Sequence, residues 1–79
     1  MLSSAEIRST TFARTRVRGA YDVAEVDAFL AGLALAVDTE TTVSRLDVIN
    51  ARFSSPRIRV GYRKSQVDDF LDRIVESLK

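Results

Sequence analysis

One pattern of apolar positions occurs twice along the chain, and each copy predicts an amphipathic helix. Apolar side chains recur at intervals of three and four residues from Val26 to Val37 and again from Val67 to Leu78. This spacing places them on one face of a helix with 3.6 residues per turn. We therefore expect two main helices, at about residues 22–38 and 64–78, that pair through these faces. The expected core of the pair is Val26, Phe29, Leu30, Leu33, Val67, Phe70, Leu71 and Ile74.

The whole chain repeats itself without an insertion, at an offset of 41 residues (62 − 21 for the two tyrosines). A period in this range is typical of repeated supersecondary units. The repeat predicts a first unit at residues 1–38, a linker at 39–43 and a second unit at 44–79. The identical pairs are Ser3/Ser44, Phe12/Phe53, Arg16/Arg57, Arg18/Arg59, Tyr21/Tyr62, Val26/Val67, Asp27/Asp68, Phe29/Phe70 and Leu30/Leu71.

Each unit should contain a short helix, an irregular arm and a main helix. The short helices are expected at about residues 3–8 and 44–51, because Ser3 and Ser44 each precede an acid by three residues, which is the spacing of a capping box. The arms, residues 12–20 and 53–61, contain β-branched residues and a glycine, and the second contains Pro56. Proline disfavours helix at and before its own position, so the arms should be extended or turned.

The connection between the units allows two arrangements. If the first main helix ends near Asp38, residues 39–43 must return the chain to the second unit. If it does not end there, it runs on into the second short helix. The sequence favours neither arrangement.

Composition argues against an enzyme and against a metal site. The chain has no Cys and no His, so it can form no disulfide and no thiolate or imidazole metal site. It also lacks a paired nucleophile and base and a glycine-rich phosphate loop, and acids at helix starts are favoured by the helix dipole alone. We expect no catalytic residue, no metal and no cofactor.

Charge and hydropathy argue against two further classes of partner or location. A formal net charge of +1 and acidic main helices do not suit a nucleic-acid-binding protein. The longest apolar run, residues 28–37, is about half of the roughly 20 residues that a membrane span needs. We expect a cytoplasmic protein that does not bind nucleic acid.

Two carboxylates near a tyrosine form a candidate binding site at the start of the second main helix. Asp68 and Asp72 lie four residues apart, a spacing at which like charges weaken a helix. Together with Tyr62 they would suit an incoming arginine, through bidentate hydrogen bonds and stacking. The alternative is a solvated face, in which Asp69 and Arg73 form a favourable pair. The first unit has Ala31 at the position of Asp72, so such a site would be one-sided.

Each arm places an apolar residue between two arginines. Such a residue could enter a lipid interface while the arginines contact anionic headgroups. The alternative is that the apolar residues fold inward against Phe12 and Phe53 and leave the arginines solvated. The candidate membrane-contact residues are Arg16, Val17 and Arg18 in the first arm and Arg57, Ile58 and Arg59 in the second.

The second unit carries Arg57-x-Arg59-x-Gly61-Tyr62 followed by Val67-Asp68-x-Phe70-Leu71-Asp72. This pattern resembles the N-terminal domain of the DivIVA/GpsB family of bacterial division and polar-growth scaffolds. The duplication most resembles the small DivIVA-domain repeat proteins of actinobacteria. The first unit reads Gly19-Ala20-Tyr21, which displaces the glycine by one residue.

The resemblance implies an all-α fold with a short coiled-coil-like helix pair that mimics the family dimer. Two helix–arm–helix repeats would pack about a pseudo-twofold. It also implies a non-enzymatic scaffold or adaptor at the cytoplasmic membrane, peripheral at the septum or pole. Its partners would be other division or cell-wall synthesis proteins.

In DivIVA-like members, apolar arm residues insert into the membrane, and the matching positions are Val17 and Ile58. In GpsB-like members, a tyrosine and two aspartates bind an arginine-containing cytoplasmic tail, and the matching positions are Tyr62, Asp68 and Asp72. The alternative function is a purely structural self-assembly module with no peptide or membrane site. A small DNA-binding protein is the weakest alternative. Because a chain of 79 residues has a small core, we also expect a homo-oligomer.

Overall fold

The computed structural model describes residues 3–16, 18–40, 43–55 and 60–78. Over these ranges the fold is mostly helical, with a small sheet that the all-α prediction did not include. The elements in chain order are α1 (Ser4–Ser9), β1 (Arg14–Thr15), β2 (Tyr21–Asp22), α2 (Val23–Asp38), α3 (Arg45–Ile49), β3 (Gly61–Tyr62) and α4 (Lys64–Ser77).

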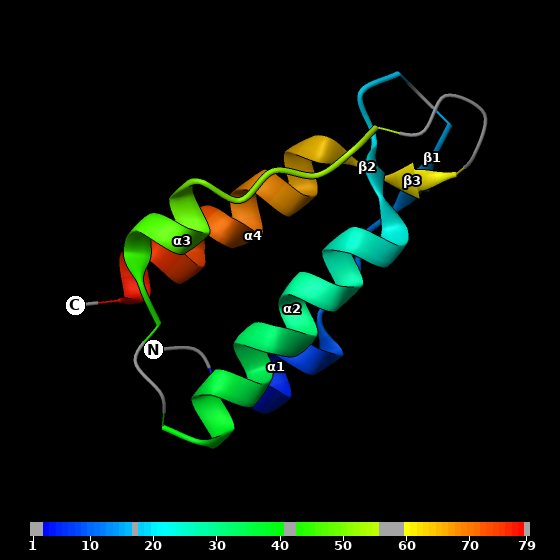
Figure 1. Cartoon of the computed structure of the whole chain (residues 1–79). Coiled ribbons are helices and arrows are strands. Elements are labelled where there is room, and N and C mark those ends of the chain that lie inside the picture. Colours follow the sequence, from blue (N-terminus) through cyan, green and yellow to red (C-terminus); the bar gives the residue numbers. More distant parts are fainter. Residues whose placement is uncertain (1–2, 17, 41–42, 56–59, 79) are drawn as a thin grey trace.

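The two long helices start at the same end of the molecule. In Figure 1, α2 (cyan to green) and α4 (orange to red) both begin beside the sheet and run away from it in the same direction. The short helix α1 packs against α2, and the short helix α3 packs against α4. Each half of the chain therefore pairs its own short helix with its own long one.

The sheet joins the two halves. Its central strand, β3, pairs antiparallel with β1 and with β2, both of which come from the first half. Tyr62 lies opposite Arg14 on one side and opposite Tyr21 on the other. Strands of two residues are too short to show an alternating pattern, so the sequence contained no signal for this sheet.

The core contains the predicted apolar stripes and one residue from each short helix. Of the eight expected core residues, seven are buried, and Phe29 is half-buried but packs against the same cluster. Ile7 of α1 and Val48 of α3 add one buried side chain each, at 3% and 2% exposure. These two positions are equivalent in the repeat (48 − 7 = 41). The short helices thus cover the sides of the stripes and widen the core.

The first main helix ends at Asp38, which decides between the two arrangements of the connection. Thr39 donates its N–H to the carbonyl of Leu35, and Glu40 has a φ of 55° that turns the chain out of the helix. The hydroxyl of Ser4 and the guanidinium of Arg8 both donate to the Asp38 carboxylate, the latter at 2.6 Å. These two hydrogen bonds, that of Ser4 first, hold the pKa of Asp38 below its usual range. The end of α2 is thereby fastened to α1.

Within the described ranges, three of the four helices begin with a side-chain cap. Ser3 and Ser44 accept the N–H of Glu6 and of Asp47, the bonds expected from the Ser-x-x-acid spacing. Asp22 caps α2 by accepting the N–H of Glu25. At the equivalent position before α4 stands Arg63, which makes no side-chain cap.

Candidate functional site

Two tyrosine–aspartate hydrogen bonds connect the halves of the chain. The hydroxyl of Tyr21 donates to Asp68 at 2.7 Å, and the hydroxyl of Tyr62 donates to Asp27, also at 2.7 Å. The second bond is the first with both partners moved by one repeat (62 − 21 = 41 and 68 − 27 = 41). Equivalent residues therefore exchange partners across the two halves.

The aromatic contacts follow the same exchange. Phe12 packs against Tyr62 and Phe70, with ring centroids 5.3 and 5.8 Å apart. Its repeat equivalent, Phe53, packs against Tyr21 and Phe29, at 5.2 and 5.6 Å. These tilted and edge-to-face geometries are favourable for aromatic rings. The phenylalanine of each arm therefore lies against the tyrosine and the long helix of the other half.

Backbone groups at the bases of the arms are bonded in the same crossed manner. The N–H of Ala13 donates to the Gln66 side chain at 2.7 Å, and the N–H of Ser54 donates to the Glu25 side chain at 3.0 Å. The carbonyls of Ala13 and Ser54 accept from the N–H groups at the starts of the opposite long helices, at 2.9 and 2.8 Å. Each arm is thus fixed on the helix start of the other half.

Burial raises the pKa of both tyrosines. The pKa of Tyr21 rises to about 12, first because of burial and then because of its hydrogen bond to Asp68, while the nearby Arg52 acts in the opposite direction. The pKa of Tyr62 is also raised, by burial and by Asp27, and Arg14 partly opposes this shift. The guanidinium carbon of Arg14 lies 5.9 Å from the centroid of the Tyr62 ring.

These shifts predict a loss of stability in strong alkali. Because the folded protein favours the neutral phenol, the stabilisation is complete below the unfolded-state pKa of about 10 and is lost as the pH rises through the folded value. With two Tyr and no Trp in the chain, tyrosinate absorbance reports these two groups alone. In the Tyr62→Phe variant, we expect the remaining tyrosine, Tyr21, to ionise near pH 12.

The Asp68→Asn variant provides the matched measurement. In the Tyr62→Phe background it should lower the pKa of Tyr21, because it removes the charged acceptor, but it should not restore the ordinary value, because burial remains. A titration of Tyr21 near pH 10 with Asp68 intact would contradict the hydrogen bond.

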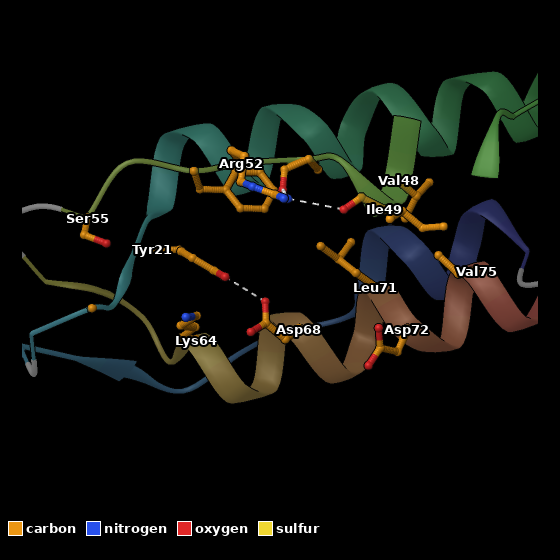
Figure 2. A pocket seen from close by; sticks show the side chains of 13 residues that line it. Tyr21, Val48, Ile49, Arg52, Ser55, Lys64, Asp68, Leu71, Asp72 and Val75 are labelled. Atoms are coloured by element: carbon orange, nitrogen blue, oxygen red, sulfur yellow. Dashed lines mark hydrogen bonds between the residues drawn. The ribbon is translucent and has the colours of Figure 1, made fainter. Parts of the chain in front are cut away.

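A groove of about 610 Å³ lies between α4 and the segment that contains α3 and the start of the second arm (Figure 2). The ring of Tyr21 enters this groove from the first half of the chain, and its hydrogen bond to Asp68 lies inside it. Asp72 lines the groove one helical turn further along α4. The groove therefore combines one tyrosine from the first half with two carboxylates from the second.

Of the three predicted groove residues, Asp68 and Asp72 line this groove and Tyr62 does not. Tyr62 is buried, with 9% exposure, and its hydroxyl is bonded to Asp27. The sequence grouped Tyr62 with the two aspartates because they are near one another along the chain. The exchange of partners puts Tyr21 in that place instead.

Within the described residues, the two carboxylates of the groove form no salt bridge with the bases that line it. Arg52 lines the groove, but its guanidinium donates to the carbonyls of Ile49 (3.3 Å) and Ala51 (2.9 Å) at the end of α3. Lys64 lies one helical turn before Asp68 on α4, and it also lines the groove (Figure 2). Over the residues that the structure describes, neither Asp68 nor Asp72 forms a salt bridge, and the Asp69–Arg73 pair of the alternative interpretation is not formed either.

The candidate membrane-contact residues fall partly outside the described ranges. Arg16 and Arg18 are described, and both are exposed. Val17, Arg57, Ile58 and Arg59 lie outside the described residues. Within the described ranges no helix is long and apolar enough to cross a membrane, and no group of three or more acidic residues is placed to hold a metal ion.

Sequence reasoning missed the groove residues that come from other segments. Tyr21, Arg52 and Ile49 line the groove, although none belongs to the helix that carries the aspartates. For Tyr21, the repeat itself contained a usable signal, because a two-unit fold can satisfy each tyrosine with the aspartate of the other unit. For Arg52 and Ile49 we see no such signal in the sequence.

The chain was compared with family models, with curated proteins and with solved structures, and no match was found in any of the three.

Proposed function

We propose that the protein is a non-enzymatic adaptor whose groove binds an arginine-bearing peptide segment of a partner protein. The observation that supports this proposal most is the pair Asp68 and Asp72, which line one groove with Tyr21 and form no salt bridge in the described part of the chain. Two nearby carboxylates that form no salt bridge repel each other, so a bound cation would stabilise them.

The geometry suits a guanidinium better than an ammonium. Side chains four residues apart on a helix stand about 5–6 Å apart at Cβ, which allows a planar guanidinium to donate to both carboxylates. The hydroxyl of Tyr21 donates to one carboxylate oxygen of Asp68, and the edge or face of the Tyr21 ring is available for contact beside that carboxylate. Arginine also stacks on aromatic rings and keeps its charge, whereas lysine is a hydrated point charge.

We further infer that the two repeats pack about a pseudo-twofold, so that one chain stands in for a dimer. The crossed tyrosine, phenylalanine and backbone contacts support this inference, because each has a counterpart at an offset of 41 residues (53 − 12 for the two phenylalanines). The similarity of the second repeat to DivIVA/GpsB proteins suggests the setting: an adaptor for division or cell-wall synthesis proteins, at the cytoplasmic side of the septum or pole. Contact of the arms with anionic membranes stays a prediction.

The test is a titration of the isotopically labelled protein with the peptide Ala-Ala-Arg-Ala-Ala, blocked at both ends. We expect the amide signals of Tyr21, Asp68 and Asp72 to shift, more weakly with lysine in place of arginine and not at all with uncharged citrulline. Asp72→Ala should weaken binding about tenfold or more, the effect of losing a charged hydrogen bond of roughly 1.5–3 kcal/mol.

Asp69→Ala is the matched control, since Asp69 is exposed on the same helix and does not line the groove. It should leave the affinity within about twofold. If Asp72→Ala and Asp69→Ala bind the arginine peptide equally well, the groove has no role and the structural self-assembly module becomes the better description.

A further inference from the structure

The groove changes character along its length. Figure 2 shows Lys64 and Ser55 near one end, Asp68 in the middle, and Ile49 and Val75 near the other end. Lys64, Asp68 and Asp72 follow one another at four-residue intervals, so they form one line along α4. From the first end to the second, the wall therefore presents a cation, two carboxylates and an apolar section.

The apolar end of the groove includes a large exposed apolar side chain. Ile49 is 51% exposed, and it lines the groove together with Val48, Leu71 and Val75. Large exposed apolar side chains that line a hollow commonly mark a contact surface. A ligand side chain placed between Ile49 and Val75 would remove apolar area from water on both α3 and α4.

The first half of the chain differs at the positions that give the groove this order. The repeat equivalent of Ile49 is Arg8, which pairs with Asp38 (49 − 8 = 41). The equivalent of Val75 is Ala34, which is fully buried at 0% exposure. Asp72 and Lys64 correspond to Ala31 and Val23. At the equivalent positions of the first half, the cation, the second carboxylate and the exposed apolar side chain are therefore absent.

The spacing of these positions along α4 suits an extended ligand. The midpoint of Asp68 and Asp72 lies about 9 Å along α4 from Lys64 and about 7.5 Å from Val75. Two residues of extended chain cover about 6.6 Å and return the side chain to the same face.

We propose that the groove selects an extended peptide with a central arginine, an acidic side chain two positions to one side and a large apolar side chain two positions to the other. The arginine contacts Asp68 and Asp72, the acid faces Lys64, and the apolar side chain lies between Ile49 and Val75. This inference rests on the proposed function, and it adds the residues that the ligand must carry around the arginine.

The test uses four blocked peptides and the full chain, with affinities measured by the same amide titration. Two peptides have the ordered sequence in the two chain directions, Glu-Ala-Arg-Ala-Leu and Leu-Ala-Arg-Ala-Glu. The third, Ala-Ala-Arg-Ala-Ala, is the reference, and the fourth, Arg-Ala-Glu-Ala-Leu, has the same composition as the first in a different order. One of the ordered peptides should bind at least about tenfold more tightly than the reference, and the reordered peptide should lose most of that gain.

Two variants show how much each end of the groove contributes to the tighter binding of the ordered peptide. Further peptides with alanine in place of leucine or glutamate measure the preference for each residue. Ile49→Ala should bring the leucine-to-alanine affinity ratio down to about one, and Lys64→Ala should do the same for the glutamate-to-alanine ratio. The control is Leu46→Ala, because Leu46 is 66% exposed on α3 but does not line the groove. It should leave both ratios unchanged.

The outcomes separate the two proposals. If the reference peptide binds and depends on Asp72, but the ordered peptides bind no better, the selection for acid and apolar residues is overturned while the arginine site stands. If the leucine-to-alanine affinity ratio is the same in Ile49→Ala as in the parent protein, the proposed contact of the apolar peptide side chain with Ile49 is overturned. If no arginine peptide binds, both proposals are overturned.

Discussion

Replacing Gly61 by alanine is expected to lower the free energy of unfolding by about 3 kcal/mol, the upper end of the usual cost of overpacking. A Cβ at this position would lie 2.6 Å from the carbonyl oxygen of Tyr21 and 2.9 Å from the Cβ of Ala20. Strand β3 pairs with β2 here, so the obstacle is mainly backbone and cannot move aside as a flexible side chain would. A chain of this size is expected to have roughly 4–12 kcal/mol of stability in total.

Urea unfolding followed by circular dichroism measures this loss. The matched control is Gly32→Ala, whose added Cβ meets nothing within 4 Å on the exposed side of α2. That variant should be more stable than the parent protein by up to about 1 kcal/mol, because alanine favours a helix over glycine. Combining Gly61→Ala with Ala20→Gly should recover part of the loss, since it removes the second contact. An unchanged unfolding midpoint for Gly61→Ala would contradict the close approach of β2 and β3.

Replacing Phe70 by alanine is expected to cost about 3–5 kcal/mol, enough to leave a protein at the lower end of the expected stability largely unfolded. Phe70 is buried, with 6% exposure, and its ring packs edge-on against Phe12 from the other half of the chain. Its repeat equivalent, Phe29, is only half-buried, although it makes the same kind of contact with Phe53. We therefore expect Phe29→Ala to cost clearly less, about 2 kcal/mol.

The comparison of these two variants measures the effect of burial on stability, since both replace a phenylalanine that packs against another phenylalanine. If Phe70→Ala does not fold, Phe70→Leu keeps the measurement possible, with an expected loss of about 1–1.5 kcal/mol. Phe29→Leu is then its matched partner and should lose less. Equal losses at the two positions, measured by urea unfolding, would show that the two halves contribute alike to the core.

The periodic part of the fold could be predicted from the sequence, and the crossed contacts could not. Three- and four-residue spacing placed α2 and α4 within about a residue of their observed bounds, and the serine caps marked both short helices. These signals are local, because each depends on a few neighbouring residues. Whether Tyr62 bonds to Asp68 in its own half or to Asp27 in the other depends on the path of the arms, which no local pattern determines.

The glycines show a second limit of the repeat pattern. In the repeat alignment, the glycine of the first half is displaced by one residue relative to Gly61. In the structure, Gly19 has a positive φ of 92°, whereas Gly61 is needed because β2 approaches it closely. At the position equivalent to Gly61, Ala20 is buried with 4% exposure and lies against Gly61 itself. One of the two facing positions must lack a side chain, and an alignment of the repeats cannot reveal that they face each other.

The candidate groove was predicted in part for the same reason. Its carboxylates lie on one helix, so their spacing was visible in the sequence. Its tyrosine comes from β2 and Ile49 of its apolar end comes from α3, and tertiary packing brings both to α4.

The crossing of contacts within one chain has a consequence for binding stoichiometry. A dimer of identical subunits shows every surface twice, so a site on one subunit is matched by a second site on the other. Here the two halves are covalently joined and chemically unlike, and the tether keeps them together at any protein concentration. With the proposed groove on the second half alone, each chain is monovalent for its peptide: it would occupy one partner tail without cross-linking two.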